Sequence, residues 1–135
     1  MTANPYMQYK KAASVTMTPI ELLVALYDKC IIETRKAIEY IGQGNFIKAG
    51  NSISHTERII DEFRFALDMK YEISSSLKQL YVWMKQVLIN ANIKKDTKAL
   101  EELIPFFTEL RDSFAEASKI AQTEGTYDGR TYSAA

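Results

Sequence analysis

Apolar residues recur along most of this chain at alternating spacings of three and four residues, the period of an amphipathic α-helix. They form four runs, separated by short segments rich in glycine, asparagine or aspartate. The first run begins at Thr18-Pro19-Ile20-Glu21, a capping box with proline at the first helical position, and ends at Gly42 and Gly44. Its apolar series is Ile20, Leu23, Tyr27, Cys30, Thr34, Ala37 and Ile41.

The other three runs have comparable start signals. Asn45 caps the second, a turn from Asp68 to Tyr71 precedes the third, and Asp96 opens the fourth. Pro105 lies inside the fourth run and predicts a bend there, not a break. The three apolar series are Phe46, Ala49, Ile53, Thr56, Ile60, Phe63 and Leu67; then Ile73, Leu77, Leu80, Met84, Val87 and Ala91, ending near Asn92; then Leu100, Leu103, Phe107, Leu110, Phe114, Ala117 and Ala121.

Four long helices with short connections favour antiparallel neighbours. The sequence therefore predicts an all-α fold, an antiparallel up-and-down four-helix bundle, over residues 18–122. Residues 1–17 form an N-terminal arm with several apolar side chains and room for one short extra helix. Residues 123–135 are expected to form a flexible tail.

Charge and composition narrow the classes of function. Seventeen basic residues balance seventeen acidic ones, so no net field attracts the chain to nucleic acid or to an anionic membrane. The chain has no apolar run long enough to span a membrane, and its first residues do not resemble a signal peptide. A single cysteine, Cys30, excludes an internal disulfide. We therefore expect a cytoplasmic protein, in the cytosol, without membrane insertion.

The residues that carry catalysis or bind metals are sparse. One histidine, His55, and one cysteine cannot form a closed Cys/His zinc site, and the Glu-x-x-His pattern of di-iron bundles is absent. Cys30 falls in an apolar series, where a small buried side chain is the ordinary interpretation. Ser74-Ser75-Ser76 lacks a nucleophile elbow and suits a helix start. We expect no enzymatic activity, no metal and no cofactor.

His55 supports one alternative function. Four-helix phosphotransfer domains use an exposed histidine on a helix, and the apolar series of the second run leaves His55 roughly on the outer face. The neighbouring Glu57 and Glu62 disfavour an added dianion, and no small residue follows one turn later. An ordinary surface histidine is the competing interpretation.

Apolar residues also lie outside the four series, more than a strict heptad core requires. A broad core accounts for some of them. The rest predict a groove that accepts an amphipathic helix or an extended apolar segment of another protein. These extra positions are Leu22, Val24, Leu26, Ile31, Ile38, Tyr40, Ile59, Tyr81, Trp83, Leu88, Ile104 and Phe106.

Several blocks of the chain resemble the flagellar secretion chaperone FliS family. Residues 17–30, MTPIELLVALYDKC, resemble its Thr-Pro-x-x-Leu-x-x-x-Leu-Tyr-Asp opening. Three further blocks match in order, and the resemblance extends from about Asn4 to Ala117. Val82-Trp83, Phe114 and Tyr71 depart from the common residues of the family. The further blocks are Ile59 to Phe63 with Ala66 to Asp68, Leu80 to Met84, and Ala91 to Asp96, and the segment Asn4-Pro5-Tyr6 with Tyr9 resembles the tyrosine-bearing arm of the family.

The resemblance implies a cytosolic export chaperone. Its client is the disordered C-terminal segment of flagellin, which it keeps from polymerising and helps deliver to the flagellar type III export apparatus. Self-association is a second way to cover an apolar groove when no client is bound. By the resemblance, Tyr6 and Tyr9 belong to an arm that covers the groove. The residues expected to bind the client are Tyr27, Ile60, Phe63, Leu67, Tyr81, Met84, Leu88, Ala91 and Asn92.

Overall fold

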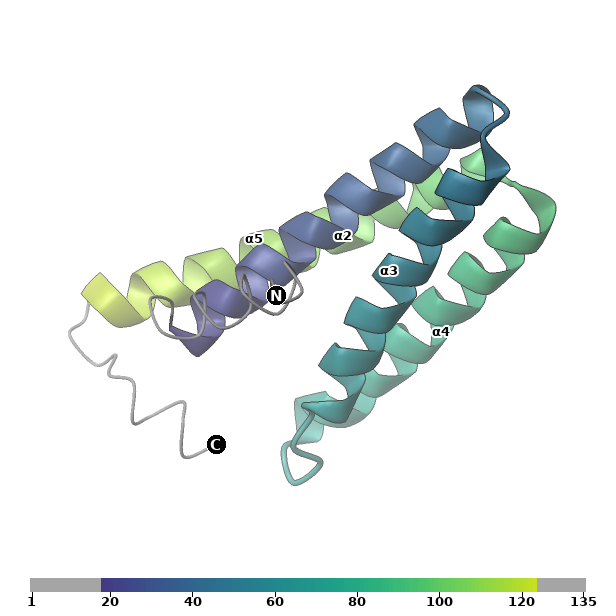
Figure 1. Cartoon of the computed structure of the whole chain (residues 1–135). Coiled ribbons are helices and arrows are strands. Elements are labelled where there is room, and N and C mark those ends of the chain that lie inside the picture. Colours follow the sequence, from purple (N-terminus) through teal and green to yellow (C-terminus); the bar gives the residue numbers. More distant parts are fainter. Residues whose placement is uncertain (1–17, 124–135) are drawn as a thin grey trace, which may run out of the picture. The chain divides into compact units, whose positions relative to one another are not determined.

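The computed structural model describes the backbone of residues 18–123 and the side chains of residues 18–120. These residues form four α-helices and no strand, which confirms the all-α prediction (Figure 1). The predicted arm, with Tyr6 and Tyr9, and residues 124–135 of the predicted tail lie outside the described residues. The helices are α2, Pro19–Gly42; α3, Phe46–Phe65; α4, Glu72–Lys94; and α5, Thr97–Thr123.

Three helices begin at the residues that the sequence predicts. The Thr18 hydroxyl accepts a hydrogen bond from the amide of Glu21 at 3.1 Å and donates one to the Glu21 carboxylate at the same distance. Asn45 Oδ1 accepts from the amide three residues later at 3.2 Å, and Asp96 Oδ1 does the same at 3.2 Å. Each side chain thus satisfies an amide that the first helical turn leaves without a backbone partner.

The helix ends show where backbone conformation limits the choice of residue. Gly44, just after α2, has a φ of 75°, a left-handed conformation that glycine adopts without steric cost. Lys95, just after α4, has a φ of 53° although it is not glycine. Helix α4 extends two residues past the predicted end at Asn92, and α5 continues without interruption through Pro105.

The chain forms two compact units. The first contains the start of α2 up to Tyr27 and the part of α5 from Glu109 onward. Within it, the rings of Tyr27 and Phe114 stack with centroids 5.8 Å apart and an interplanar angle of 13°. This ring contact joins the two segments of the first unit.

The second unit, Asp28–Thr108, contains four helical segments in sequence order. Helices α3 and α4 lie side by side and antiparallel (Figure 1), as their short connection requires. Buried residues from all four segments form its core, and this agrees with the predicted bundle. Its buried apolar residues are Cys30, Ile31, Ala37, Ala49, Ile53, Ile59, Ile60, Phe63, Tyr81, Met84, Leu88, Ala91, Leu100, Leu103 and Phe107.

The small side chains of Cys30 and Thr34 on α2 lie inside this core. Burial, with a smaller contribution from the Glu33 carboxylate, raises the pKa of the Cys30 thiol far above its usual range. The thiol therefore stays protonated, as expected for a small buried side chain. The Thr34 hydroxyl is buried and has no hydrogen-bond partner among the described residues.

The predicted core series of α4 is wrong at several positions. Only Met84 and Ala91 of the predicted series are buried, whereas Ile73 is 66% exposed. The core uses Tyr81 and Leu88, each one residue after a predicted position. Because α4 is apolar at both members of each pair, periodicity alone cannot select between them. Leu80 and Val87 remain half-buried as a result.

Candidate functional site

Most residues expected to bind the client lie in the packed interior. The rings of Phe63 and Tyr81 approach to 5.6 Å between α3 and α4. Leu67 and Asn92 are half-buried, so a partner can reach parts of both side chains. A side chain without exposed area cannot touch a partner unless the helices separate. The buried members are Tyr27, Ile60, Phe63, Tyr81, Met84, Leu88 and Ala91.

Asn92 lies where α3 and α4 approach closely. Its Oδ1 accepts a hydrogen bond from Lys95 Nζ at 2.7 Å. The Lys95 ammonium lies over the ring of Phe46, 5.8 Å from its centroid. A Cβ atom at Gly50 would lie 3.6 Å from the same Asn92 oxygen. This corner therefore combines a polar anchor with a half-exposed aromatic ring.

Most exposed large apolar residues in the larger unit occur at positions that the four series leave out; Phe46 and Ile73 are exceptions. One set surrounds the α3–α4 turn, where Phe65 is 81% exposed. Another pair joins two helices: the rings of Trp83 on α4 and Phe106 on α5 meet edge to face with centroids 5.0 Å apart. Trp83 and Phe106 were recognisable in the sequence as apolar residues beyond the core series. The turn set is Phe65, Met69, Tyr71 and Ile73.

An ion pair lies at the edge of α4 that faces α3. Lys85 Nζ donates to both carboxylate oxygens of Asp61, at 2.9 and 2.8 Å. Burial raises the pKa of the nearby Glu57, and the Asp61 charge adds to the rise, while Lys85 and Arg58 oppose it. On this edge the charges of Lys85 and Asp61 are already paired within the chain.

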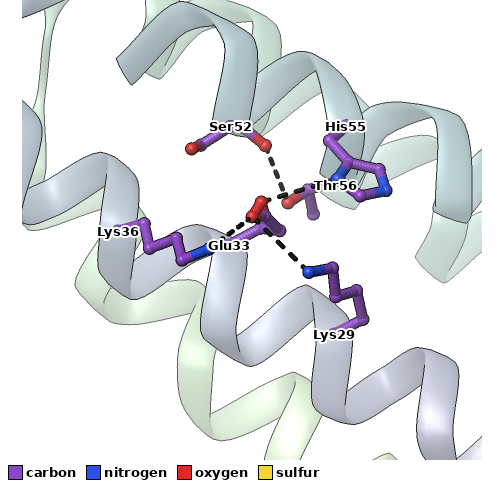
Figure 2. A network of polar contacts seen from close by, with 6 residues as sticks. All are labelled: Lys29, Glu33, Lys36, Ser52, His55 and Thr56. Atoms are coloured by element: carbon purple, nitrogen blue, oxygen red, sulfur yellow. Dashed lines mark hydrogen bonds and ion pairs between the residues drawn. The ribbon is translucent and has the colours of Figure 1, made fainter. Parts of the chain in front are cut away.

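The prediction that His55 lies on the outer face is wrong. Its side chain is 22% exposed, and Nδ1 lies 3.5 Å from Oε2 of Glu33, a nearly buried carboxylate on α2. Figure 2 shows this carboxylate between Lys29 and Lys36, which approach its Oε1 to 4.0 and 3.6 Å. On α3 beside it, the Thr56 hydroxyl donates to the Ser52 carbonyl at 3.2 Å.

This arrangement bears on the phosphotransfer alternative. A phosphoryl group on His55 would place a dianion beside the Glu33 carboxylate, where like charges repel. The contact of Glu33 with His55 joins α2 to α3, whereas its ion pairs with Lys29 and Lys36 lie within α2. Lys29 and Lys36 lie nearby but are already paired with Glu33, and the imidazole is only 22% exposed, so the site does not favour phosphotransfer.

Two features are absent from residues 18–123. None of their helices is long and apolar enough to cross a membrane. Within the same residues, no group of three or more histidine, cysteine, aspartate or glutamate side chains could hold a metal ion.

Comparisons with known proteins agree over most of the chain. The family described as "Flagellar protein FliS" matches residues 2–121. The flagellar secretion chaperone FliS of Bacillus subtilis is 33% identical over 114 residues, covering 84% of this chain and 86% of the relative. The protein of the same name from Salmonella typhimurium is 26% identical over 111 residues, covering 80% and 82%.

A solved structure shares the fold. It is described as the crystal structure of a flagellar chaperone from bacteria, and it superposes with a TM-score of 0.71 at 24% sequence identity. The match covers 85% of this chain and 98% of that structure. Because the family match extends over most of the sequence and includes all four helices, this chain belongs to the FliS family of flagellar proteins.

Proposed function

We propose that this protein is a cytosolic export chaperone for flagellin. It binds the disordered C-terminal segment of flagellin, prevents premature polymerisation, and helps deliver the client to the flagellar type III export apparatus. The observation that carries the proposal is the family match over residues 2–121, together with the relatives named flagellar secretion chaperones.

The surface of the larger unit supports this function physically. A disordered client loses conformational entropy when it binds, so it needs a large apolar contact area. Several large apolar side chains are exposed at the α3–α4 turn and beside the α4–α5 seam. The net charge of zero also suits a partner that is recognised by apolar contact. The proposed activity needs no catalytic group, metal or cofactor.

The expected binding residues acquire two different roles in this proposal. Leu67 and Asn92 contact the client directly, because part of each side chain is accessible. The buried members that belong to the larger unit, Ile60, Phe63, Tyr81, Met84, Leu88 and Ala91, support its surface from beneath. Tyr6 and Tyr9 belong to an arm that competes with the client for the groove. Deleting residues 1–17 should therefore change client affinity, and an unchanged affinity by calorimetry would remove the arm from the mechanism.

Titration calorimetry with a flagellin C-terminal peptide tests the proposal, with helicity followed by circular dichroism. We expect binding with a negative heat-capacity change and a gain in helicity, because the client orders on an apolar surface. A peptide of the same composition in scrambled order is the control and should not bind. No heat and no added helicity, with the chaperone folded, would overturn the proposal. Sedimentation of the free protein reports whether it self-associates without client.

A further inference from the structure

The aromatic pair of Trp83 and Phe106 lies at the surface of the larger unit. Trp83 is 44% exposed and Phe106 is 40% exposed, although their rings touch each other. A tryptophan that keeps this much exposed area offers a large, rigid contact surface with an N–H donor at its edge. Such residues are frequent anchors of protein interfaces.

The residues around Trp83 on α4 carry no charge. On a helix surface, the neighbours of a residue lie three, four and seven positions away. All six such neighbours of Trp83 are apolar, amide or hydroxyl residues, and all are half-exposed or exposed. We name these residues the neutral stripe: Ser76, Gln79, Leu80, Trp83, Gln86, Val87 and Asn90.

The composition of the neutral stripe is unusual for this chain, in which 25% of residues are charged. Lys78 and Lys85 of α4 lie outside it, and Lys85 is paired with Asp61 of α3. On α5, Glu102 lies one turn before Phe106, so the stripe is confined to α4. An exposed helix face usually carries charges, because they keep the surface hydrated. Their absence over four turns leaves Leu80, Trp83 and Val87 flanked on α4 only by uncharged side chains, which lose less on desolvation than charged ones do.

We propose that the neutral stripe is a docking face for an amphipathic helix whose polar flanks carry amide and hydroxyl side chains instead of charges. The proposal rests on the proposed function, because it makes this helix part of the client. Gln79, Gln86 and Asn90 both donate and accept hydrogen bonds, so they satisfy partner amides and hydroxyls. A charged partner flank would be desolvated against the stripe without an opposite charge.

Two synthetic peptides test the chemistry of the partner. Both have the same leucine-rich apolar face; one has Gln, Asn and Ser on its flanks, and the other alternates Lys and Glu. We expect the uncharged peptide to bind the full chain about tenfold more tightly, with affinity changing less than about twofold between about 50 and 500 mM NaCl. Equal affinities, or tighter binding of the charged peptide, would overturn the proposal.

Two variants with matched controls test the position of the site. Trp83→Gln and Gln86→Lys should each weaken binding of the uncharged peptide by about tenfold. Ile47→Gln and Asn51→Lys make the same kinds of change at exposed positions of α3 and should leave affinity within about twofold. Thermal unfolding of each variant checks that it is folded. Equal losses in variants and controls would contradict a site at the neutral stripe.

The same variants separate this inference from the proposed function. If the wild type binds the flagellin peptide and the two stripe variants bind it equally well, the inference fails and the chaperone function stands. If the wild type binds the uncharged peptide but not flagellin, the chaperone function fails and the stripe remains a docking face. If Trp83→Gln abolishes a dimer without changing peptide affinity, the stripe is an interface between copies and the inference fails.

Discussion

The two edges of α4 differ in chemistry although they belong to one helix. The edge that faces α3 carries the Lys85–Asp61 ion pair, with the Phe63–Tyr81 ring contact between the same two helices. The edge beside α5 carries Trp83, with a ring contact to Phe106 and only uncharged neighbours on its own helix. On the first edge, Lys85 and the ring of Tyr81 have partners on α3, whereas the second edge leaves apolar area exposed.

The difference indicates that one edge of α4 contributes to folding and the other is available to bind a partner. A hydrogen-bonded ion pair favours one partner geometry but adds little net stability, because both groups lose hydration when they pair. An uncharged apolar edge does not favour one partner geometry, and its exposed area remains accessible to a partner. The comparison predicts that substitutions toward α3 or the core change stability, whereas those on the neutral stripe change binding.

The largest contrast involves two adjacent residues, Met84 and Trp83. Met84 is fully buried, so Met84→Ala should lower the free energy of unfolding by about 2–5 kcal/mol, through lost apolar burial and the cavity left behind. Trp83→Gln should lower it by about 1 kcal/mol or less, because half of the ring is already in water and one ring contact is lost. Urea unfolding monitored by circular dichroism measures both.

Client affinity should show the opposite order. In the folded fraction of each variant, Trp83→Gln should weaken client binding more than Met84→Ala does. Ile47→Gln is the control and should leave client affinity unchanged, because Ile47 is 81% exposed on α3 and lies outside the stripe. The comparison breaks down if Trp83→Gln destabilises the protein as much as Met84→Ala does.

The sequence was sufficient to predict the helices but not the side of α4 that is buried. The caps at Thr18, Asn45 and Asp96 are local interactions, so each can be recognised from a few residues. The choice between Leu80 and Tyr81 depends on the shape of the space that α3 and α5 leave. That shape arises only when the helices pack together, and no local pattern encodes it.

The same limit explains the outcome for His55 and the candidate site. The series on α3 placed His55 outside the core, but it did not reveal that Glu33 of α2 lies across from it. Apolar residues beyond the core series, such as Trp83 and Phe106, were visible in the sequence as a surplus. Which of them stay exposed could not be predicted, because exposure depends on every neighbouring helix.

Exchanging one charge between the edges sharpens the comparison. The double substitution Lys85→Gln with Gln86→Lys keeps the composition but moves a cation from the α3 edge to the neutral stripe. We expect a loss of about 0.5–1 kcal/mol in unfolding free energy, since the pair is part-exposed. We also expect weaker client binding, measured by calorimetry. Exchange of Lys78 and Gln79 leaves the Asp61 pair intact and should lower binding alone.

Removing the charge of Lys85 should also change the pKa of Glu57. Lys85 lowers the pKa of Glu57, so Lys85→Met should raise that pKa further above its ordinary value of 4.5. Carbon-detected NMR titration of the side-chain carboxyl measures it. Lys78→Met, two turns earlier on α4, is the control and should have a smaller effect. A fall in the Glu57 pKa on Lys85→Met would contradict this electrostatic account of the edge.

The smallest effect is the dependence of stability on pH that arises from Glu57, near the edge of α4 that faces α3. Because burial raises the folded pKa of Glu57 above 4.5, the folded state binds a proton more tightly than the unfolded state. Stability from this group is therefore present below pH 4.5 and is lost as the pH rises through the folded pKa. Glu57→Gln should remove that loss and stabilise the protein at pH 7 by less than about 0.5 kcal/mol, because solvent screens a part-exposed carboxylate.

Urea unfolding of wild type and Glu57→Gln at pH 4 and pH 7 measures this effect. The two proteins should be equally stable at pH 4, where the wild-type carboxyl is largely protonated and resembles the amide. Glu101→Gln, at an exposed position of α5, shows what loss of a negative charge does away from this edge. If Glu57→Gln destabilises the protein at pH 7, the Glu57 charge contributes to the α3 edge through attraction to Lys85 and Arg58. This attraction would then outweigh the cost of desolvating the Glu57 carboxylate. The charged groups at the edge of α4 that faces α3 would stabilise the protein more than their exposure suggests.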